Sequence, residues 1–269
     1  MPFHLNPTLL HRLSMADRPL YGGWICMGSP VSAELMAGSG LDWVLIDMEH
    51  APNGLESVLA QLHAVSGYPC TPVVRVPAGE PVAIKQVLDL GAQTLVVPMV
   101  STPQQARDIV AAALYPPAGR RGVGSALARS ARWNRVENYL RDAVEYVSVI
   151  VQIESLEGVA NARAIAETPG IDAVFVGPSD LAASMGLLGQ QTHPDVTSAV
   201  LNAFEGARHA GKPFGVNAFM PDMVERYTAA GATFVLVGAD VALLARESEA
   251  LAARYLPVVV GIPEHRESY

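Results

Sequence analysis

Residues 147–180 read VSVIVQIESLEGVANARAIAETPGIDAVFVGPSD, in which two short apolar runs flank a longer, alanine-rich run. The apolar runs, 147–153 and 173–176, are apolar at nearly every position, which is typical of strands buried on both faces. A strand, a helix and a second strand in this order predict a parallel sheet whose strands are connected by helices.

The same alternation continues in both directions along the chain. The candidate strands are 22–27, 43–48, 73–76, 94–99, 147–153, 173–176, 214–216 and 234–237, and candidate helices include 55–65, 82–90, 103–114 and 239–253. Eight strand–helix units in a chain of this length predict a closed (β/α)₈ (TIM) barrel. A doubly wound open sheet also fits the alternation, but it usually has fewer strands. It often carries a glycine-rich turn after the first strand, which Gly22-Gly23 is not.

Composition favours one globular domain. The chain has 269 residues, 50% of them apolar and 16% charged, so it can bury a sizeable core. We expect a single domain over 1–269, with its core at about 20–255 and short extensions at both ends. Residues 115–145 are the irregular stretch, with Pro116-Pro117 and Arg132-Trp133-Asn134. A connection of that length predicts a functional loop or an interface element.

Charge and cysteine content restrict the partners and the compartment. The net charge is −8 without a Lys/Arg cluster, which argues against nucleic acid or an anionic membrane as a partner. No apolar run approaches the roughly 18 residues of a membrane span, and residues 1–20 do not resemble a signal peptide. Cys26 and Cys70 are expected to be reduced core residues. The sequence therefore predicts a cytoplasmic protein.

Polar side chains gather where the predicted strands end, which is where barrel enzymes carry their chemistry. They are Asp47, Glu49 and His50 after the second strand, Arg75 on the third, Gln152 and Glu154 on the fifth, and Ser179 and Asp180 after the sixth. Each has a simpler structural explanation: a helix cap for Asp180, a helix N-terminus for Glu154, an ion pair for Arg75 and a loop contact for His50. Together, however, they bring complementary groups to one rim.

Glu154 and Asp180 are hard oxygen donors from neighbouring strands. Two carboxylates leave most of an octahedral shell to water and substrate, which is typical of Mg²⁺ or Mn²⁺ sites. A 2-keto acid could chelate such an ion, which would act as a Lewis acid and stabilise the enolate that forms at carbon 3. Arg75 adds a permanent positive charge beside the enolate oxygen. His50 is the natural general base near neutral pH, and Asp47 could orient its imidazole.

Two other chemistries are disfavoured. Schiff-base catalysis needs a lysine near the end of a strand, but Lys85 falls inside a predicted helix and Lys212 precedes the seventh strand. A phosphorylated substrate needs an anion site after the last strands, where Gly238-Ala239-Asp240 places an aspartate instead.

Seven motifs in order resemble the HpcH/HpaI aldolases, over roughly residues 20–255. They are DMEHAP (47–52), PVVR (72–75), VPMV (97–100), YPPAG (115–119), RGVG (121–124), VQIE (151–154) and VGPSD (176–180). The resemblance implies a barrel of the phosphoenolpyruvate/pyruvate type and a class II aldolase dependent on Mg²⁺, Mn²⁺ or Co²⁺. Such enzymes reversibly cleave 4-hydroxy-2-oxo acids to pyruvate and an aldehyde. The stretches 125–129 and 132–135 are similar to members that act on 4-hydroxy-2-oxoheptanedioate in aromatic catabolism, releasing succinate semialdehyde.

The resemblance also implies a role for each matching residue. His50 would accept the proton with Asp47 as its partner, and Arg75 would stabilise the transition state. Glu154 and Asp180 would bind the metal, while Gln152 and the backbone of Ser179 would hold the keto acid. Asp89 matches a position that raises the basicity of the histidine, from across a subunit contact; its position alone suggests a solvated charge at a helix end.

The family further implies a homohexamer, a trimer of dimers, with an exchanged C-terminal helix that 239–253 could supply. Two positions depart from the family pattern. Ser179 stands where alanine is expected, and Asn217 stands where an apolar residue is usual, toward the aldehyde. Two alternative functions remain open: decarboxylation of oxaloacetate or cleavage of acyl-CoA esters at the same site, and keto-acid binding without catalysis.

Overall fold

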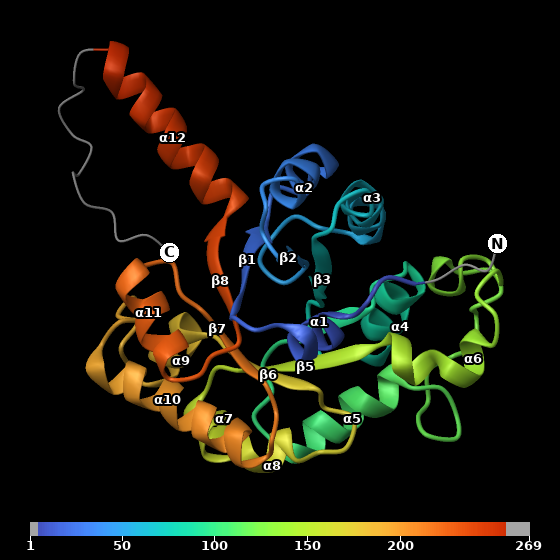
Figure 1. The fold of residues 1–269 in the computed structure, drawn as a ribbon. Coiled ribbons are helices and arrows are strands. Elements are labelled where there is room, and N and C mark those ends of the chain that lie inside the picture. Colours follow the sequence, from blue (N-terminus) through green and yellow to red (C-terminus); the bar gives the residue numbers. More distant parts are fainter. Residues whose placement is uncertain (1–4, 257–269) are drawn as a thin grey trace.

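Eight parallel strands close into a barrel in sequence order in the computed structural model, which describes residues 5–256 (Figure 1). The strands are β1 (Leu20–Ile25), β2 (Trp43–Asp47), β3 (Thr71–Arg75), β4 (Thr94–Val97), β5 (Ser148–Ile153), β6 (Ala173–Val176), β7 (Phe214–Asn217) and β8 (Phe234–Ala239). β8 pairs with β1 and closes the ring. The predicted (β/α)₈ barrel is confirmed, and the open sheet is excluded.

The predicted bounds differ from the observed ones by a few residues. β1 begins at Leu20 and β3 at Thr71, because the backbone N–H of Leu20 and of Thr71 donates to Thr233 O and Asp42 O, respectively. β4 ends at Val97, two residues before the predicted end, and Met99 has a left-handed φ of 59°. Because Met99 lies outside the strand, its backbone N–H can point toward the rim of the barrel.

Helices surround the barrel, and one of them closes the end at which the strands begin. The longer ones are α1 (Leu9–Met15), α2 (Pro30–Ala37), α3 (Leu55–Val65), α4 (Pro81–Asp89), α5 (Pro103–Ala113), α9 (Pro178–Ser184), α10 (Pro194–His209), α11 (Pro221–Ala229) and α12 (Asp240–Tyr255), with short α7 (Leu156–Ala160) and α8 (Ala162–Ala166) between β5 and β6. α1 closes the N-terminal end, where the backbone N–H of Leu9 donates to Thr94 Oγ1 at 3.1 Å.

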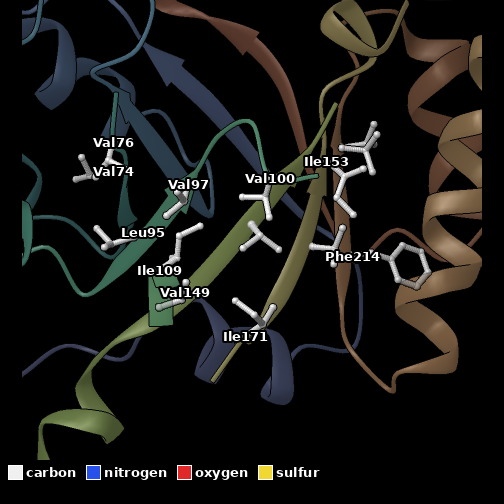
Figure 2. Packing of buried hydrophobic residues seen from close by; sticks show 14 of the residues in the cluster. Val74, Val76, Leu95, Val97, Val100, Ile109, Val149, Ile153, Ile171 and Phe214 are labelled. Carbon is white, nitrogen blue, oxygen red and sulfur yellow. The ribbon is translucent and has the colours of Figure 1, made fainter. Parts of the chain in front are cut away.

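Two apolar layers follow from the alternation of side chains along each strand. One set of residues fills the inside of the barrel, including Trp43, Phe175 and Phe234. The intervening residues, such as Val74, Val97 and Val149, pack outward against the helices (Figure 2). Gly22 leaves room for the indole of Trp43, since a Cβ there would lie 2.4 Å from the ring.

The irregular stretch at 115–145 contains only short helices, η1 (Arg129–Ala131), α6 (Tyr139–Asp142) and η2 (Ala143–Tyr146), together with a cis bond between Pro116 and Pro117. α12 projects away from the barrel (Figure 1), and its Leu243, Leu244 and Leu251 are exposed. No helix within 5–256 is long and apolar enough to cross a membrane. The predicted single domain over 1–269 extends beyond the described residues at both ends.

Candidate active site

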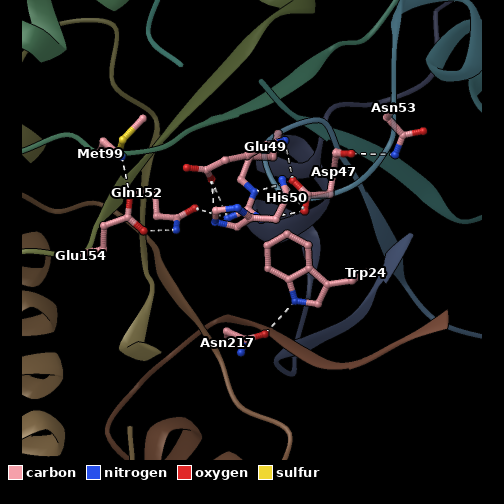
Figure 3. Close-up of polar contacts among 10 residues, drawn as sticks. Trp24, Asp47, Glu49, His50, Asn53, Met99, Gln152, Glu154 and Asn217 are labelled. Carbon is pink, nitrogen blue, oxygen red and sulfur yellow. Dashed lines mark hydrogen bonds and ion pairs between the residues drawn. The ribbon is translucent and has the colours of Figure 1, made fainter. Parts of the chain in front are cut away.

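Side chains alternate between the inside and the outside of the barrel along each strand, and several inward side chains at the C-terminal rim are polar. Asp47 and Arg75 are the last residues of β2 and β3, and the register pairs them directly. Gln152 lies near the end of β5, with Glu154 two residues further on. Figure 3 shows Asp47, Gln152 and Glu154 among the polar side chains at this end of the strands. A cavity of about 430 Å³ opens there, lined by Asp47, His50, Arg75, Gln152, Gly177, Ser179 and Asp180, among others.

Arg75 is fixed by a buried two-point ion pair. Its Nε and Nη2 each donate to the carboxylate of Asp47 at 2.8 Å. Asp47 also accepts from the backbone N–H of Glu49 at 3.0 Å and of His50 at 3.3 Å. The indole of Trp24 covers the guanidinium, with Cζ 4.3 Å from the ring centroid. The guanidinium therefore has one orientation, with Nη1 directed toward Gln152 Oε1 at 3.5 Å.

Glu49 and His50 leave the rim on the loop after β2. Glu49 Oε2 lies 2.9 Å from Arg75 Nη1 and 3.9 Å from His50 Nε2. Burial raises the pKa of Glu49, Arg75 opposes that shift, and the nearby carboxylates of Asp47 and Asp180 add to it. The His50 side chain is 62% exposed, so its ring can meet a substrate entering from solvent.

Glu154 is a buried carboxylate at the edge of the same cavity. Its Oε1 accepts from the backbone N–H of Met99 at 2.6 Å, and its Oε2 accepts from Gln152 Nε2. The pKa of Glu154 is raised to about 7, chiefly by burial and also by the negative charges of Asp180 and Glu49, although the two hydrogen bonds oppose this shift. A buried carboxylate close to two others is a position that a cation would stabilise.

The surroundings of Glu154 fit a divalent ion. Gly177 lets the side chains of Gln152 and Glu154 approach the backbone closely, since a Cβ there would lie 2.9 Å from Gln152 Nε2 and 3.0 Å from Glu154 Oε2. Asp180 adds an exposed carboxylate from the first turn of α9. The N-cap of that helix is Gly177, so the simpler interpretation of Asp180 as the cap is wrong. Within 5–256 no cluster of three or more His, Cys, Asp or Glu side chains could hold a metal. Two carboxylates suit Mg²⁺ or Mn²⁺, which keep water and substrate ligands.

Asp240 accepts hydrogen bonds from the backbone N–H groups that follow β1. Its carboxylate accepts from the backbone N–H of Cys26 and Met27 at 2.8 and 3.2 Å, and from Ser32 Oγ at 2.6 Å. These donors are thus already bound to an anion of the chain itself. The arrangement agrees with the expectation that this rim does not bind a substrate phosphate.

Comparison with known proteins identifies the family. A sequence profile described as "HpcH/HpaI aldolase/citrate lyase" matches residues 20–246. A protein named 4-hydroxy-2-oxo-heptane-1,7-dioate aldolase from Salmonella heidelberg is 52% identical over 240 residues, covering 89% of this chain and 91% of that protein. The chain belongs to the HpcH/HpaI aldolase/citrate lyase family.

Further relatives in the HpcH/HpaI family share both sequence and fold. The protein of the same name from Salmonella arizonae is 53% identical over 240 residues, with 89% and 91% of the two chains covered. The crystal structure of an HpcH/HpaI aldolase/citrate lyase family protein from Burkholderia cenocepacia superposes with a TM-score of 0.87, at 42% identity, and covers 91% of this chain and 98% of that one.

The candidate site brings together His50, Arg75, Gln152, Glu154, Ser179 and Asp180, which were expected at the rim. Asp47 also lies there, but its carboxylate binds Arg75 and backbone amides, and among residues 5–256 it forms no hydrogen bond or ion pair with the imidazole ring. Asp89 lies at the end of α4, at the opposite end of the barrel, where Arg121 Nη2 contacts it at 2.6 Å. A role beside His50 would therefore need the Asp89 of a second copy.

Sequence reasoning missed part of the wall of the HpcH/HpaI site. Trp24 and Phe175 line the cavity as inward residues of β1 and β6, and Cys26 follows β1 into it. Cys70 is buried as predicted, but Cys26 is half-buried at the site and is not an ordinary core residue. The alternation of side chains along a strand could have identified them, because Trp24 lies two residues after Gly22 and therefore faces the inside of the barrel as well.

Proposed function

We propose that this chain is a divalent-metal-dependent aldolase that reversibly cleaves 4-hydroxy-2-oxo acids to pyruvate and an aldehyde. The observation that carries this proposal is a single cavity lined by a fixed guanidinium, Arg75, with the buried carboxylate of Glu154 at its edge. The substrate 4-hydroxy-2-oxoheptanedioate, which gives pyruvate and succinate semialdehyde, is inferred from the names of the relatives at 52–53% identity.

Glu154 and Asp180 would hold the metal, with the amide of Gln152 and the backbone of Ser179 beside the keto acid. A bound Mg²⁺, Mn²⁺ or Co²⁺ would supply Lewis acidity toward the 2-keto oxygen. The close approach of Glu154 to Gly177 and the negative charges of Asp180 and Glu49 near Glu154 support this assignment. Gln152 orients the carboxylate by donating to its Oε2, so the ligand has a fixed direction before any ion arrives.

Arg75 supplies the positive charge where negative charge develops. Cleavage of the bond between carbons 3 and 4 leaves an electron pair that moves onto the keto oxygen of the pyruvate unit. A guanidinium held on two sides by Asp47 needs no reorganisation as that charge forms. Asp47 in this scheme positions Arg75, in addition to the predicted role as partner of the imidazole.

His50 would accept the proton of the 4-hydroxyl group during cleavage and return it to the aldehyde oxygen in the reverse reaction. Its exposed ring and the nearby Glu49 carboxylate support this role, because a carboxylate stabilises the imidazolium that forms. Lysine chemistry is disfavoured further, since Lys85 lies within α4 and Lys212 lies before β7, outside the cavity lining.

The assembly is proposed to be a homohexamer built as a trimer of dimers. The projecting α12, with exposed Leu243, Leu244 and Leu251, supports exchange of this helix between copies. The predicted role of Asp89 depends on such an assembly, because the residue lies far from His50 in its own chain. The absence of nucleic-acid and membrane partners and a cytoplasmic location stay predictions from the sequence.

The alternative of an acyl-CoA lyase is less well supported. Arg75 is the one Lys or Arg among the residues that line the cavity in the described chain, and Asp47 already binds it. Nucleotide phosphates would therefore find no free cation there. Oxaloacetate decarboxylation needs the same enolate stabilisation and is expected as a side activity.

Pyruvate release from racemic 4-hydroxy-2-oxoheptanedioate tests the proposal. Protein stripped with EDTA should be inactive and should regain turnover with Mg²⁺, Mn²⁺ or Co²⁺. The Glu154→Gln variant should not regain turnover when metal is added. The Glu157→Gln variant, changed on the outer helix α7, should regain it. Turnover that survives EDTA would refute metal dependence. A metal-binding protein without turnover on any 4-hydroxy-2-oxo acid would favour keto-acid binding without catalysis.

A further inference from the structure

Another cavity, of about 260 Å³, lies at the N-terminal end of the barrel, opposite the candidate active site. It opens beside Thr71 and Thr94, the first residues of β3 and β4. The residues that line it include Arg12, Arg129 and Arg132 but no Asp or Glu. A wall with three cations and no carboxylate is unusual in a chain whose net charge is −8.

The hydrogen bonds of these arginines go to neutral acceptors. Arg129 Nη1 donates to Leu90 O at 3.1 Å, and Arg132 Nη1 donates to Arg129 O at 2.8 Å. Arg12 Nη1 donates to Thr71 Oγ1 at 3.0 Å. Within 5–256 none of the three forms an ion pair with a carboxylate side chain. Neutral acceptors satisfy single N–H groups, but they leave the charges of Arg129 and Arg132 uncompensated, whereas Arg12 lies near the carboxylate of Asp42.

The local backbone brings Arg129 and Arg132 together. They stand three residues apart across the 3₁₀ turn η1, in which side chains at that spacing eclipse each other. Both guanidiniums lie against Gly91, since a Cβ there would lie 2.7 Å from Arg129 Nη1 and 3.1 Å from Arg132 Nη1. Burial lowers the pKa of Arg129 to about 10, and the neighbouring Arg132 contributes to that shift.

The segment after the turn is strained. Arg132, Trp133 and Asn134 have left-handed φ values of 49°, 54° and 63°, a conformation that side chains disfavour. Strain of this kind persists where the surrounding structure holds it in place, and it is frequent at binding and active sites. The stretch at 132–134 has no part in the proposed aldol chemistry.

We propose that this cavity is a binding site for a small molecule that carries two or more negative charges, a phosphate or a dicarboxylate, bound between Arg129 and Arg132. Paired guanidiniums donate several N–H groups in the planar geometry that phosphate and carboxylate oxygens accept. Ser66, Gln93 and Thr94 add neutral polar groups to the same wall. The inference does not depend on the proposed function, because within one chain the cavity and the active site lie at opposite ends of the strands.

Isothermal titration of the full-length protein tests the proposal, with inorganic phosphate in one arm and malonate in the other, at constant ionic strength. Acetate, a monoanion, is the reference for non-specific binding. At least one dianion should bind, and Arg129→Gln and Arg132→Gln should each weaken it by about tenfold or more. Arg107→Gln is the matched control, because Arg107 is an exposed arginine that donates to Gln104 Oε1. That variant should bind as the wild type does.

Ser66→Asp provides a second variant that does not remove an arginine. Ser66 is exposed at the wall of the cavity, so a carboxylate there should take the place of the ligand. We expect this variant to unfold at a higher temperature than the wild type without added anion and to lose dianion binding. The proposal is overturned if neither dianion binds more tightly than acetate, or if binding is the same in the wild type and in the arginine variants.

Discussion

Asn217 Oδ1 accepts a 2.7 Å hydrogen bond from the indole Nε1 of Trp24, which links β7 to β1 across the mouth of the barrel. The same indole covers the guanidinium of Arg75. Asn217 therefore fixes the ring that packs on the central cation of the site. This bond gives a physical reason for a polar residue at a position where the family resemblance led us to expect an apolar one.

Asn217→Leu should lower stability by about 1 kcal/mol, because it removes the acceptor of a partly buried N–H group. It should also change the KM for different aldehydes in the synthetic direction more than the KM for pyruvate. Urea denaturation and a panel of polar and apolar aldehydes measure the two effects.

Trp24→Phe is the partner in a double-mutant cycle. If the hydrogen bond accounts for the loss, Asn217→Leu should cost less stability in the Trp24→Phe background than in the wild type. Equal costs in both backgrounds would show that the bond contributes nothing measurable.

Asp47→Asn should reduce stability by about 3 kcal/mol, because it leaves the buried guanidinium of Arg75 without its counter-charge. It should raise the KM for pyruvate and lower kcat, since the guanidinium loses its fixed direction. Asp108→Asn, at an exposed pair with Arg120, is the control and should change neither. If Asp47 acts chiefly on the imidazole, the variant should instead shift the pH profile and leave the KM for pyruvate unchanged.

Gly177→Ala should weaken metal binding by at least about tenfold, because its methyl group would enter the space beside Glu154 Oε2 and Gln152 Nε2. Gly67→Ala is the matched control, since a Cβ there meets nothing within 4 Å. Titration of Mn²⁺ by electron paramagnetic resonance measures the affinity without depending on turnover. Equal Mn²⁺ affinity in the two variants would place the ion elsewhere.

The sequence predicted the barrel and the rim residues for a common reason. Strands buried on both faces are apolar throughout, so a polar residue such as Arg75 or Glu154 at a strand end is conspicuous. Trp24 was missed because an indole at that position is apolar like the core around it. The partner of Asp47 was missed because the pairing of Asp47 with Arg75 depends on the register between β2 and β3, which sequence spacing does not specify.

Glycines follow the ends of α4 and α11. Gly91 and Gly231 have φ values of 94° and 98°, which only glycine adopts readily, so they mark where helices must end. The cavity with Arg129 and Arg132 could not be predicted, because its arginines come from an irregular segment and its other walls come from α1, β3 and β4.

Asp42→Asn should destabilise the protein at pH 7 by about 1 kcal/mol or less, because the Arg18 partner is half-exposed and the pair is screened by solvent. The hydrogen bond from Arg18 lowers the pKa of Asp42 below 3.8, although burial opposes this, and the N–H of Tyr21 lowers it further. A lowered folded-state pKa stabilises the fold above the unfolded pKa, and the stabilisation is lost as the pH falls through the folded value. The wild type and the variant should therefore converge in stability below about pH 4, where the unfolded carboxyl protonates. A constant difference from pH 7 to pH 3 would contradict this account.

The most direct test of the central claim is the exchange of the methyl protons of pyruvate for deuterium, followed by NMR in D₂O. This exchange requires enolate formation at the site but no particular aldehyde, so it separates the chemistry from the identity of the natural substrate. We predict exchange well above the rate of metal and buffer alone, abolished by EDTA and by Glu154→Gln and slowed at least about a hundredfold by Arg75→Lys. Exchange that continues in EDTA, or that is unchanged in Arg75→Lys, would contradict the assignment of this site.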